Sequence, residues 1–272
     1  MRALPAIAFA FALGASKLVA AQEAEGQEPL PLNDLAKLSS SERRQLLSAL
    51  SRDDQAKALA QFPVGDLLST GLKRVGELGT YRLRLIKEER VDGKLLPQQT
   101  MDLLVQQAPL AILAEVVAGP AKGRRLLYNA ALRTDEFRVK EAGLLGAAGA
   151  VWIGLDNKMT RRDTRHRATN LGYSPVLSMI ETYFVKAQPV GGYARKDEGF
   201  GENGYCMLYT APAAAKGLYA TKARLCVDPV ELLPTRVETW DGEGLLERLT
   251  FELKATRVKT PEDQFTPKGA GL

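Results

Sequence analysis

An alternation of apolar and charged residues between residues 80 and 107 is the clearest pattern in the chain. Apolar side chains recur at every second position of two runs, which is the period of a strand with one buried face. Asp92-Gly93 separates the runs, and this dipeptide suits the positive φ values of a tight hairpin turn. The inward positions that the hairpin predicts are Tyr81, Leu83, Leu85, Met101, Leu103 and Val105.

Helical spacing replaces the alternation before the hairpin, in residues 33–79. Ser40 and Asp53 are residue types that cap helices, and Pro63 is typical of a first helical turn, so three helices are predicted. A further helical pattern covers residues 172–186. The third helix predicts a covering stripe that contains Leu67, Leu68 and Leu72.

The rest of the chain has the pattern of strands joined by short turns. The last strand alternates over residues 245–258, with Leu249, Phe251 and Leu253 on its apolar side. About nine to eleven strands without βαβ alternation predict an α+β fold: a single strongly curved antiparallel sheet with helices covering one face. This domain is expected to span residues 80–266, including the internal helix, and to end in a tail at 267–272.

The N-terminal residues 1–21 have the features of a secretory signal, and the polar residues 22–32 predict a flexible lead-in. Export would place the protein in the periplasm or outside the cell. Removing Arg2 and Lys17 with the signal lowers the formal net charge from +5 to +3. This modest excess argues against nucleic acid as a partner and allows transient contact with an anionic membrane surface.

Cys206 and Cys226 are the two cysteines, and both lie in strand-like runs. If they pair directly across an antiparallel hairpin, Leu208 lies opposite Arg224 on a polar face. The other face then collects Tyr205, Met207, Tyr209, Ala223 and Leu225. This consistent division predicts a disulfide in an exported protein, which would stabilise the fold by roughly 3 kcal/mol. A redox or metal pair is the alternative, and neither CxxC spacing nor a ligand cluster supports it.

His166 is the only histidine and the one candidate for catalysis. A general base needs a carboxylate or nucleophile within hydrogen-bond reach, and Asp163 and Asp156 are the acids nearby in sequence. No second histidine supports a metal site, so neither a metal nor a cofactor is predicted. The favoured interpretation is structural: His166 fixes the loop before the helix at Gly172.

Two other charged groups have ordinary explanations. Glu88 and Glu89 point to opposite faces of the first strand, and an ion pair with a neighbouring strand is favoured over acid–base chemistry. The arginine run at positions 161, 162, 165 and 167 predicts a solvated loop. Contact with phosphate head groups is its alternative.

Four blocks resemble a bacterial secreted family catalogued as domain of unknown function 1571. They are KEERVDGKLLPQQTM, GPAKGRRLLYN, DTRHRATNLGYSPVL and RLCVDPVELLPTRVETWD, within Val64 to Thr266. The resemblance implies a fold similar to periplasmic carriers and acceptors of lipoproteins of the LolA and LolB types. That fold is an unclosed half-barrel with helices on its concave apolar side. The resemblance implies a ligand class and no reaction.

The sequence therefore predicts a non-catalytic carrier or sensor that binds a lipid or lipidated partner between sheet and helices. An acyl chain of about fourteen carbons would gain roughly 11 kcal/mol there before ordering costs. The alternatives are a cell-envelope hydrolase or transferase that uses His166, and an interaction module that pairs through a sheet edge. The predicted ligand-binding residues are Tyr81, Leu83, Leu85, Leu103, Val105, Leu249, Phe251, Leu253, Leu67, Leu68 and Leu72.

Overall fold

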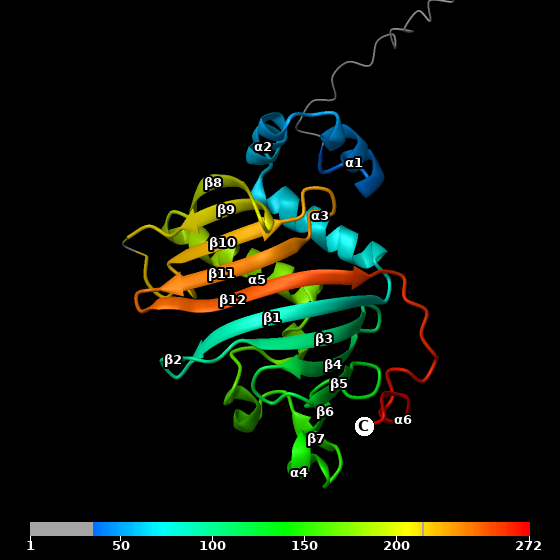
Figure 1. The fold of residues 1–272 in the computed structure, drawn as a ribbon. Coiled ribbons are helices and arrows are strands. Elements are labelled where there is room, and N and C mark those ends of the chain that lie inside the picture. Colours follow the sequence, from blue (N-terminus) through cyan, green and yellow to red (C-terminus); the bar gives the residue numbers. More distant parts are fainter. Residues whose placement is uncertain (1–34, 214) are drawn as a thin grey trace, which may run out of the picture. The chain divides into compact units, whose positions relative to one another are not determined.

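The alternating segments form one antiparallel sheet in the computed structural model, which describes residues 35–213 and 215–272 (Figure 1). The expected signal segment and the whole of the expected lead-in, residues 22–32, lie outside these residues. The first seven strands are β1 (Tyr81–Val91), β2 (Lys94–Leu95), β3 (Gln99–Gln106), β4 (Ala111–Ala118), β5 (Arg125–Asn129), β6 (Glu136–Lys140) and β7 (Val151–Gly154). The others are β8 (Ala194–Gly201), β9 (Gly204–Thr210), β10 (Lys222–Val227), β11 (Pro234–Asp241) and β12 (Gly244–Ala255).

The sheet is open. Its strand order is β7-β6-β5-β4-β3-β1-β12-β11-β10-β9-β8, and β2 pairs only with β1. The strands at the two ends, β7 and β8, do not pair with each other, so the sheet is not closed into a barrel. The α+β fold with a single unclosed antiparallel sheet is confirmed, with twelve strands where the sequence predicted nine to eleven.

The strand order results from one long connection. Neighbouring strands in the sequence are mostly joined by short turns, whereas residues 155–193 lead from β7 at one edge to β8 at the other. This crossover segment contains three 3₁₀ turns, Lys158–Arg161, Ala168–Asn170 and Gln188–Val190, and the helix α5 (Tyr173–Ala187). Figure 1 shows α5 behind the sheet, so the crossover segment covers one face, here termed the inner face.

Three helices lie in the N-terminal segment for which helical spacing was found: α1 (Ser40–Ser48), α2 (Arg52–Ala60) and α3 (Val64–Glu77). The N-cap residues of α1 and α2 lie one and two positions before the predicted Ser40 and Asp53. Ser39 forms a capping box with Glu42, and Ser51 caps α2. Helix α3 packs beside α5 on the inner face. None of the described helices combines the length and apolar character needed to cross a membrane.

Tyr173, the first residue of α5, joins that helix to the two central strands. Its ring lies 5.7 Å from the ring of Tyr81 and 5.6 Å from that of Phe251. Its backbone N–H donates to the Tyr81 hydroxyl at 3.1 Å. Gly172 makes this approach possible, because its φ is 100° and a Cβ there would lie 2.9 Å from that hydroxyl.

The cysteine hairpin follows the predicted register. Cys206 and Cys226 are cross-strand partners and form a disulfide, and Leu208 lies opposite Arg224. The chain end, which includes the short helix α6 (Pro267–Ala270), forms a second small core on the outer face of the sheet. Its buried members are Leu104, Ala111, Leu127, Phe265 and Ala270.

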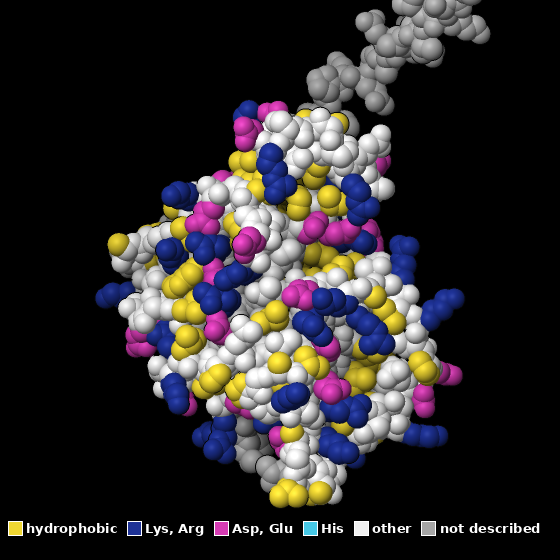
Figure 2. Space-filling view, in the orientation of Figure 1, with side chains coloured by type: hydrophobic (Ala, Val, Ile, Leu, Met, Phe, Trp, Pro, Cys, Tyr) yellow, Lys and Arg dark blue, Asp and Glu magenta, His cyan; other side chains and the backbone are white. Residues whose placement is uncertain are grey.

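The outer face of β10–β12 carries a network of alternating charges, and Figure 2 shows basic and acidic side chains interspersed over this side of the molecule. At its centre Glu238, only 1% exposed, accepts hydrogen bonds from Arg224 (2.7 Å), Arg236 (2.8 Å) and Arg248 (2.6 Å). Burial raises the pKa of Glu238, but the three arginines outweigh it and hold that pKa below its ordinary value.

We expect Glu238→Gln to lower the free energy of unfolding at pH 7 by about 2–4 kcal/mol, because the arginines lose their buried carboxylate. The contribution of a carboxylate with a lowered pKa is complete above its unfolded-state pKa and disappears as the pH falls through the folded-state value. The difference between wild type and variant should therefore shrink below about pH 4.5. Urea unfolding between pH 3 and 8 measures it. A pH-independent difference would contradict this assignment.

Candidate functional site

The inner face changes from apolar to polar along the central strands. On β1 the inward series Tyr81, Leu83, Leu85 continues as Lys87 and Glu89, which are 7% and 2% exposed. On β12 the inward series ends similarly, with the fully buried Glu247. Glu89 and Glu247 are direct cross-strand partners. Two like charges in this position are destabilising unless donors or a positive charge lie between them.

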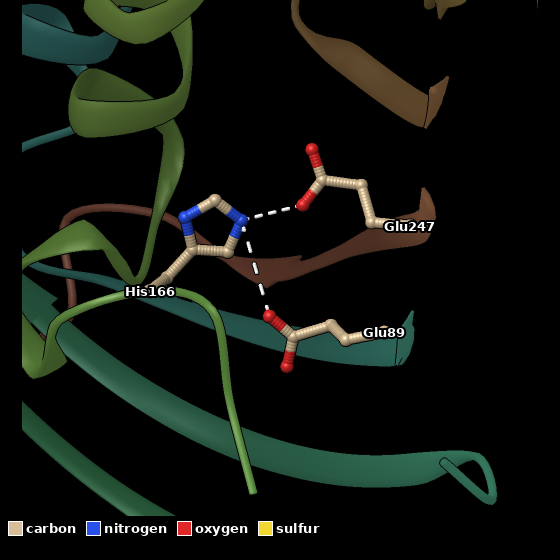
Figure 3. Close-up of side chains that lie close together, drawn as sticks. All are labelled: Glu89, His166 and Glu247. Carbon is tan, nitrogen blue, oxygen red and sulfur yellow. Dashed lines mark hydrogen bonds and ion pairs between the residues drawn. The ribbon is translucent and has the colours of Figure 1, made fainter. Parts of the chain in front are cut away.

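His166 supplies such a group from the crossover segment. Its Nε2 lies 2.5 Å from Oε2 of Glu247 and 3.9 Å from Oε1 of Glu89. Figure 3 shows both carboxylates directed toward this one nitrogen. The histidine side chain is 11% exposed, so the three groups meet away from bulk water.

Further donors hold the outer parts of both carboxylates. Glu89 pairs with Lys87 and accepts from the hydroxyl of Thr164 (3.2 Å) and the backbone N–H of Arg165 (3.1 Å). Glu247 accepts from the hydroxyls of Tyr219 (3.0 Å) and Thr239 (3.3 Å) through Oε1. We term these residues the His166 cluster: Lys87, Glu89, Thr164, His166, Tyr219, Thr239 and Glu247.

The charges in the cluster support one another. Burial alone lowers the pKa of His166, but the hydrogen bond and charge of Glu247, with the charge of Glu89, raise it above its ordinary value. Burial alone raises the pKa of Glu247, but the hydrogen bond and charge of His166, with the hydroxyl of Tyr219, hold it below its ordinary value. The cluster therefore favours an imidazolium beside a carboxylate, and it fastens the crossover segment to β1 and β12.

The acids nearest to His166 in sequence are not its partners. Asp163 pairs with Arg124 at 2.5 Å, and Asp156 pairs with Arg167 at 2.5 Å. The true partners come from distant strands and were missed as partners of His166. A signal for them exists, because extending the inward alternation two residues at a time beyond Leu85 reaches positions 87 and 89.

Glu88 and Glu89 of β1 point to opposite faces of the sheet, as predicted. Glu88 lies on the outer face and forms an ion pair with Arg248 of β12 at 2.6 Å. Glu89 points inward and contacts the crossover segment, in addition to its bond with Lys87 on the same strand.

A cavity of about 140 Å³ lies next to the cluster, between residues 160–171 of the crossover segment and the inner face of β3–β7. Its apolar lining consists of Met101, Val116, Leu126, Phe137, Val139, Ile153, Ala168 and Leu171. Its polar lining consists of Lys87, Gln99, Arg124, Glu141, Thr160, Asp163, Thr164, His166 and Arg167. Cavities of roughly this size accept a benzene-sized group, which is less than the fourteen-carbon chain that the sequence suggested.

None of the predicted ligand-binding residues borders this cavity. Nine of them are buried, and Leu72 and Leu253 are partly buried, all within the main core between sheet and helices. The physical reason is that α5 packs onto the central strands through Tyr173, and α3 packs against α5. Their part in ligand binding stays a prediction.

A second hollow, of about 330 Å³ and open to solvent, lies on another side of the histidine. Its lining includes His166, Asn170 and the stacked rings of Tyr183 and Tyr219, whose centroids are 4.6 Å apart. His166 borders both hollows, so the cluster separates an apolar space from a polar one.

Glu89→Gln is expected to lower the free energy of unfolding by about 3–5 kcal/mol, because Lys87 stays buried without its carboxylate. Amide exchange in residues 160–171 should accelerate, since Thr164 and Arg165 bond to the same group. The matched control is Glu88→Gln on the outer face, which should cost about 1 kcal/mol or less. Urea unfolding and hydrogen-exchange mass spectrometry measure both variants. Equal losses of unfolding free energy in the two variants would show that the buried Lys87–Glu89 pair stabilises the fold no more than the exposed pair does.

Comparison with known proteins gives one family and several distant structural likenesses. The family model described as "Protein of unknown function (DUF1571)" matches residues 78–269. No curated protein matches the chain.

The structural likenesses cover most of the fold at low identity. Lipoprotein LppX of Mycobacterium tuberculosis is 16% identical over 71% of this chain and 97% of its own, with a TM-score of 0.40. A putative outer membrane lipoprotein-sorting protein domain of Vibrio parahaemolyticus is 11% identical over 75% and 99%, with a TM-score of 0.37. A LolA superfamily protein of Nitrosomonas europaea is 11% identical over 73% and 96%, with a TM-score of 0.32.

Proposed function

Since the chain belongs to the DUF1571 family, whose function is unknown, we propose from its own geometry that it is an exported, non-catalytic binding protein for a lipid or lipidated partner. The observation that carries this proposal is the 140 Å³ cavity under the crossover segment. An apolar group would enter the cavity, and the polar residues at its border would face the rest of the ligand.

The lining of the cavity suits one apolar group of limited size. Each buried CH₂ contributes about 0.8 kcal/mol, so a group of about six carbons gains about 5 kcal/mol before ordering costs. Arg124 and Lys87 border the cavity, and their carboxylate partners leave the border nearly balanced in charge. A border of this kind accepts a zwitterionic head group or a peptide backbone as readily as an anion.

Binding of a whole acyl chain would need more space. Eight of the predicted ligand-binding residues lie on β1, β3 and β12 and three lie on α3, all within the main core. If α3 and α5 move away from the sheet, the apolar stripe of β1 and β12 becomes available to the remainder of the chain. The proposal therefore has two forms, a small preformed site and a larger site that opens on binding.

Export is part of the proposal. Residues 1–21 resemble a secretory signal, and the Cys206–Cys226 disulfide suits an oxidising compartment. A periplasmic or extracellular location would bring the protein to lipids and lipidated proteins, and to the anionic membrane surface that its net positive charge allows it to contact.

A series of fatty acids from six to fourteen carbons distinguishes the two forms. Affinity is expected to rise about fourfold for each added carbon while the cavity is filling. It should level off near six carbons if the cavity is fixed, and continue to rise if the helices separate. Detergent-free calorimetry and native mass spectrometry of the purified protein measure it. Absence of binding at every length, with no co-purified lipid, would contradict the proposal.

Val139→Trp should fill the cavity from β6 and weaken binding of these fatty acids at least about tenfold, since the new ring occupies the space of the ligand. Leu113→Trp is the matched control, because Leu113 lies on the outer face of β4 and does not border the cavity. Circular dichroism checks that both variants fold. Unchanged binding in a folded Val139→Trp variant would place the ligand elsewhere.

A further inference from the structure

We propose that Glu89, His166 and Glu247 form a binding site for a divalent transition-metal ion, with Zn²⁺ as the best-fitting example. One ligand atom from each residue, the imidazole Nε2 or a carboxylate oxygen, lies within 4.8 Å of the others. Imidazole and carboxylate are both zinc ligands, and three protein ligands are typical of zinc sites that keep a position open.

The strand register supplies the first argument. Glu89 and Glu247 are direct cross-strand partners and are 2% and 0% exposed. Lys87 balances one of these two buried charges. His166 faces the second, with its Nε2 2.5 Å from Glu247, and a divalent ion between the three groups would bind both carboxylates at once. It would replace the hydrogen bond between His166 and Glu247.

The bonds around the three residues supply the second argument. Glu247 has Oε1 held by Tyr219 and Thr239, which leaves Oε2 directed toward His166. Glu89 has Oε2 held by Lys87. Its Oε1, the oxygen that faces His166, accepts bonds from Thr164 and Arg165, so an ion bound to this oxygen would take the place of one of these two donors. Donors that fix the outer oxygens of ligating carboxylates are the usual surroundings of a metal ion.

The distances require only small movements. Zinc bonds to nitrogen and oxygen are about 2.0–2.2 Å long, so two ligands of one ion lie at most about 4.4 Å apart. The 3.9 Å between His166 and Glu89 is within this limit, and the 2.5 Å between His166 and Glu247 must widen. The two carboxylate oxygens lie within 4.8 Å of each other, so they approach by a few tenths of an ångström at most. His166, which comes from the crossover segment, borders both hollows, so an ion can reach its side of the site from solvent.

The test uses the mature protein after treatment with a chelator, titrated with ZnCl₂ and, separately, MnCl₂ in a calorimeter. We expect one ion per chain and a rise in the melting temperature with ZnCl₂. His166→Gln and Glu247→Gln should each weaken zinc binding by about 100-fold or more, because each removes one of three ligands. Glu88→Gln, the neighbour of Glu89 on the outer face, should bind zinc as the wild type does.

A second measurement avoids variants that fail to fold. Titration of the wild type with CoCl₂ should produce the visible absorption bands of a low-coordinate site, and ZnCl₂ should abolish them. Two results would overturn the proposal: no saturable zinc binding by the wild type up to about millimolar ion, or binding that persists in folded His166→Gln and Glu247→Gln variants. Metal binding is measured without any lipid, so its failure leaves the proposed function separately testable.

Discussion

The pairing of β1 with β12 is the constraint on which the rest of the structure depends. These strands come from opposite ends of the domain, and each starts one half of the sheet by pairing with its sequence neighbours on the other side. The pairing fixes two register partners, Glu89 and Glu247, at one end of the two central strands on the inner face. It also forces the chain to return from one edge of the sheet to the other, because β7 and β8 lie at its two ends.

The crossover segment contacts two different surfaces on the inner face. At one end of the central strands the inward residues are apolar, and α3 and α5 pack on them with aromatic contacts around Tyr173. At the other end they are charged, and the turns around His166 bind them through hydrogen bonds and ion pairs. The cavity lies where the apolar lining of β3–β7 meets this polar attachment.

Cavity and cluster share residues, and this sharing links the two proposals physically. Lys87, Thr164 and His166 border the cavity and also bond within the cluster. A group that enters the cavity therefore changes the surroundings of the buried charges, and a change at the charges alters how firmly the crossover segment is held. Burying so many ionisable groups contributes little to stability compared with an apolar core, which is a reason to expect that they serve a function.

The sequence by itself determined the local structure and part of the pairing. Alternation identified the strands around Tyr81 and Phe251, and helical spacing identified α5. The division of the cysteine hairpin into a polar and an apolar face gave the register and the disulfide of Cys206 and Cys226. Each of these features depends on residues that are close together in the sequence. Only the tertiary structure decided that Glu89 and Glu247 meet at His166, since this needs the pairing of strands from opposite ends of the domain. The position and size of the cavity were likewise beyond the sequence, because they depend on how residues 160–171 fit against side chains of β3–β7 that alternation can place inward but cannot fit together.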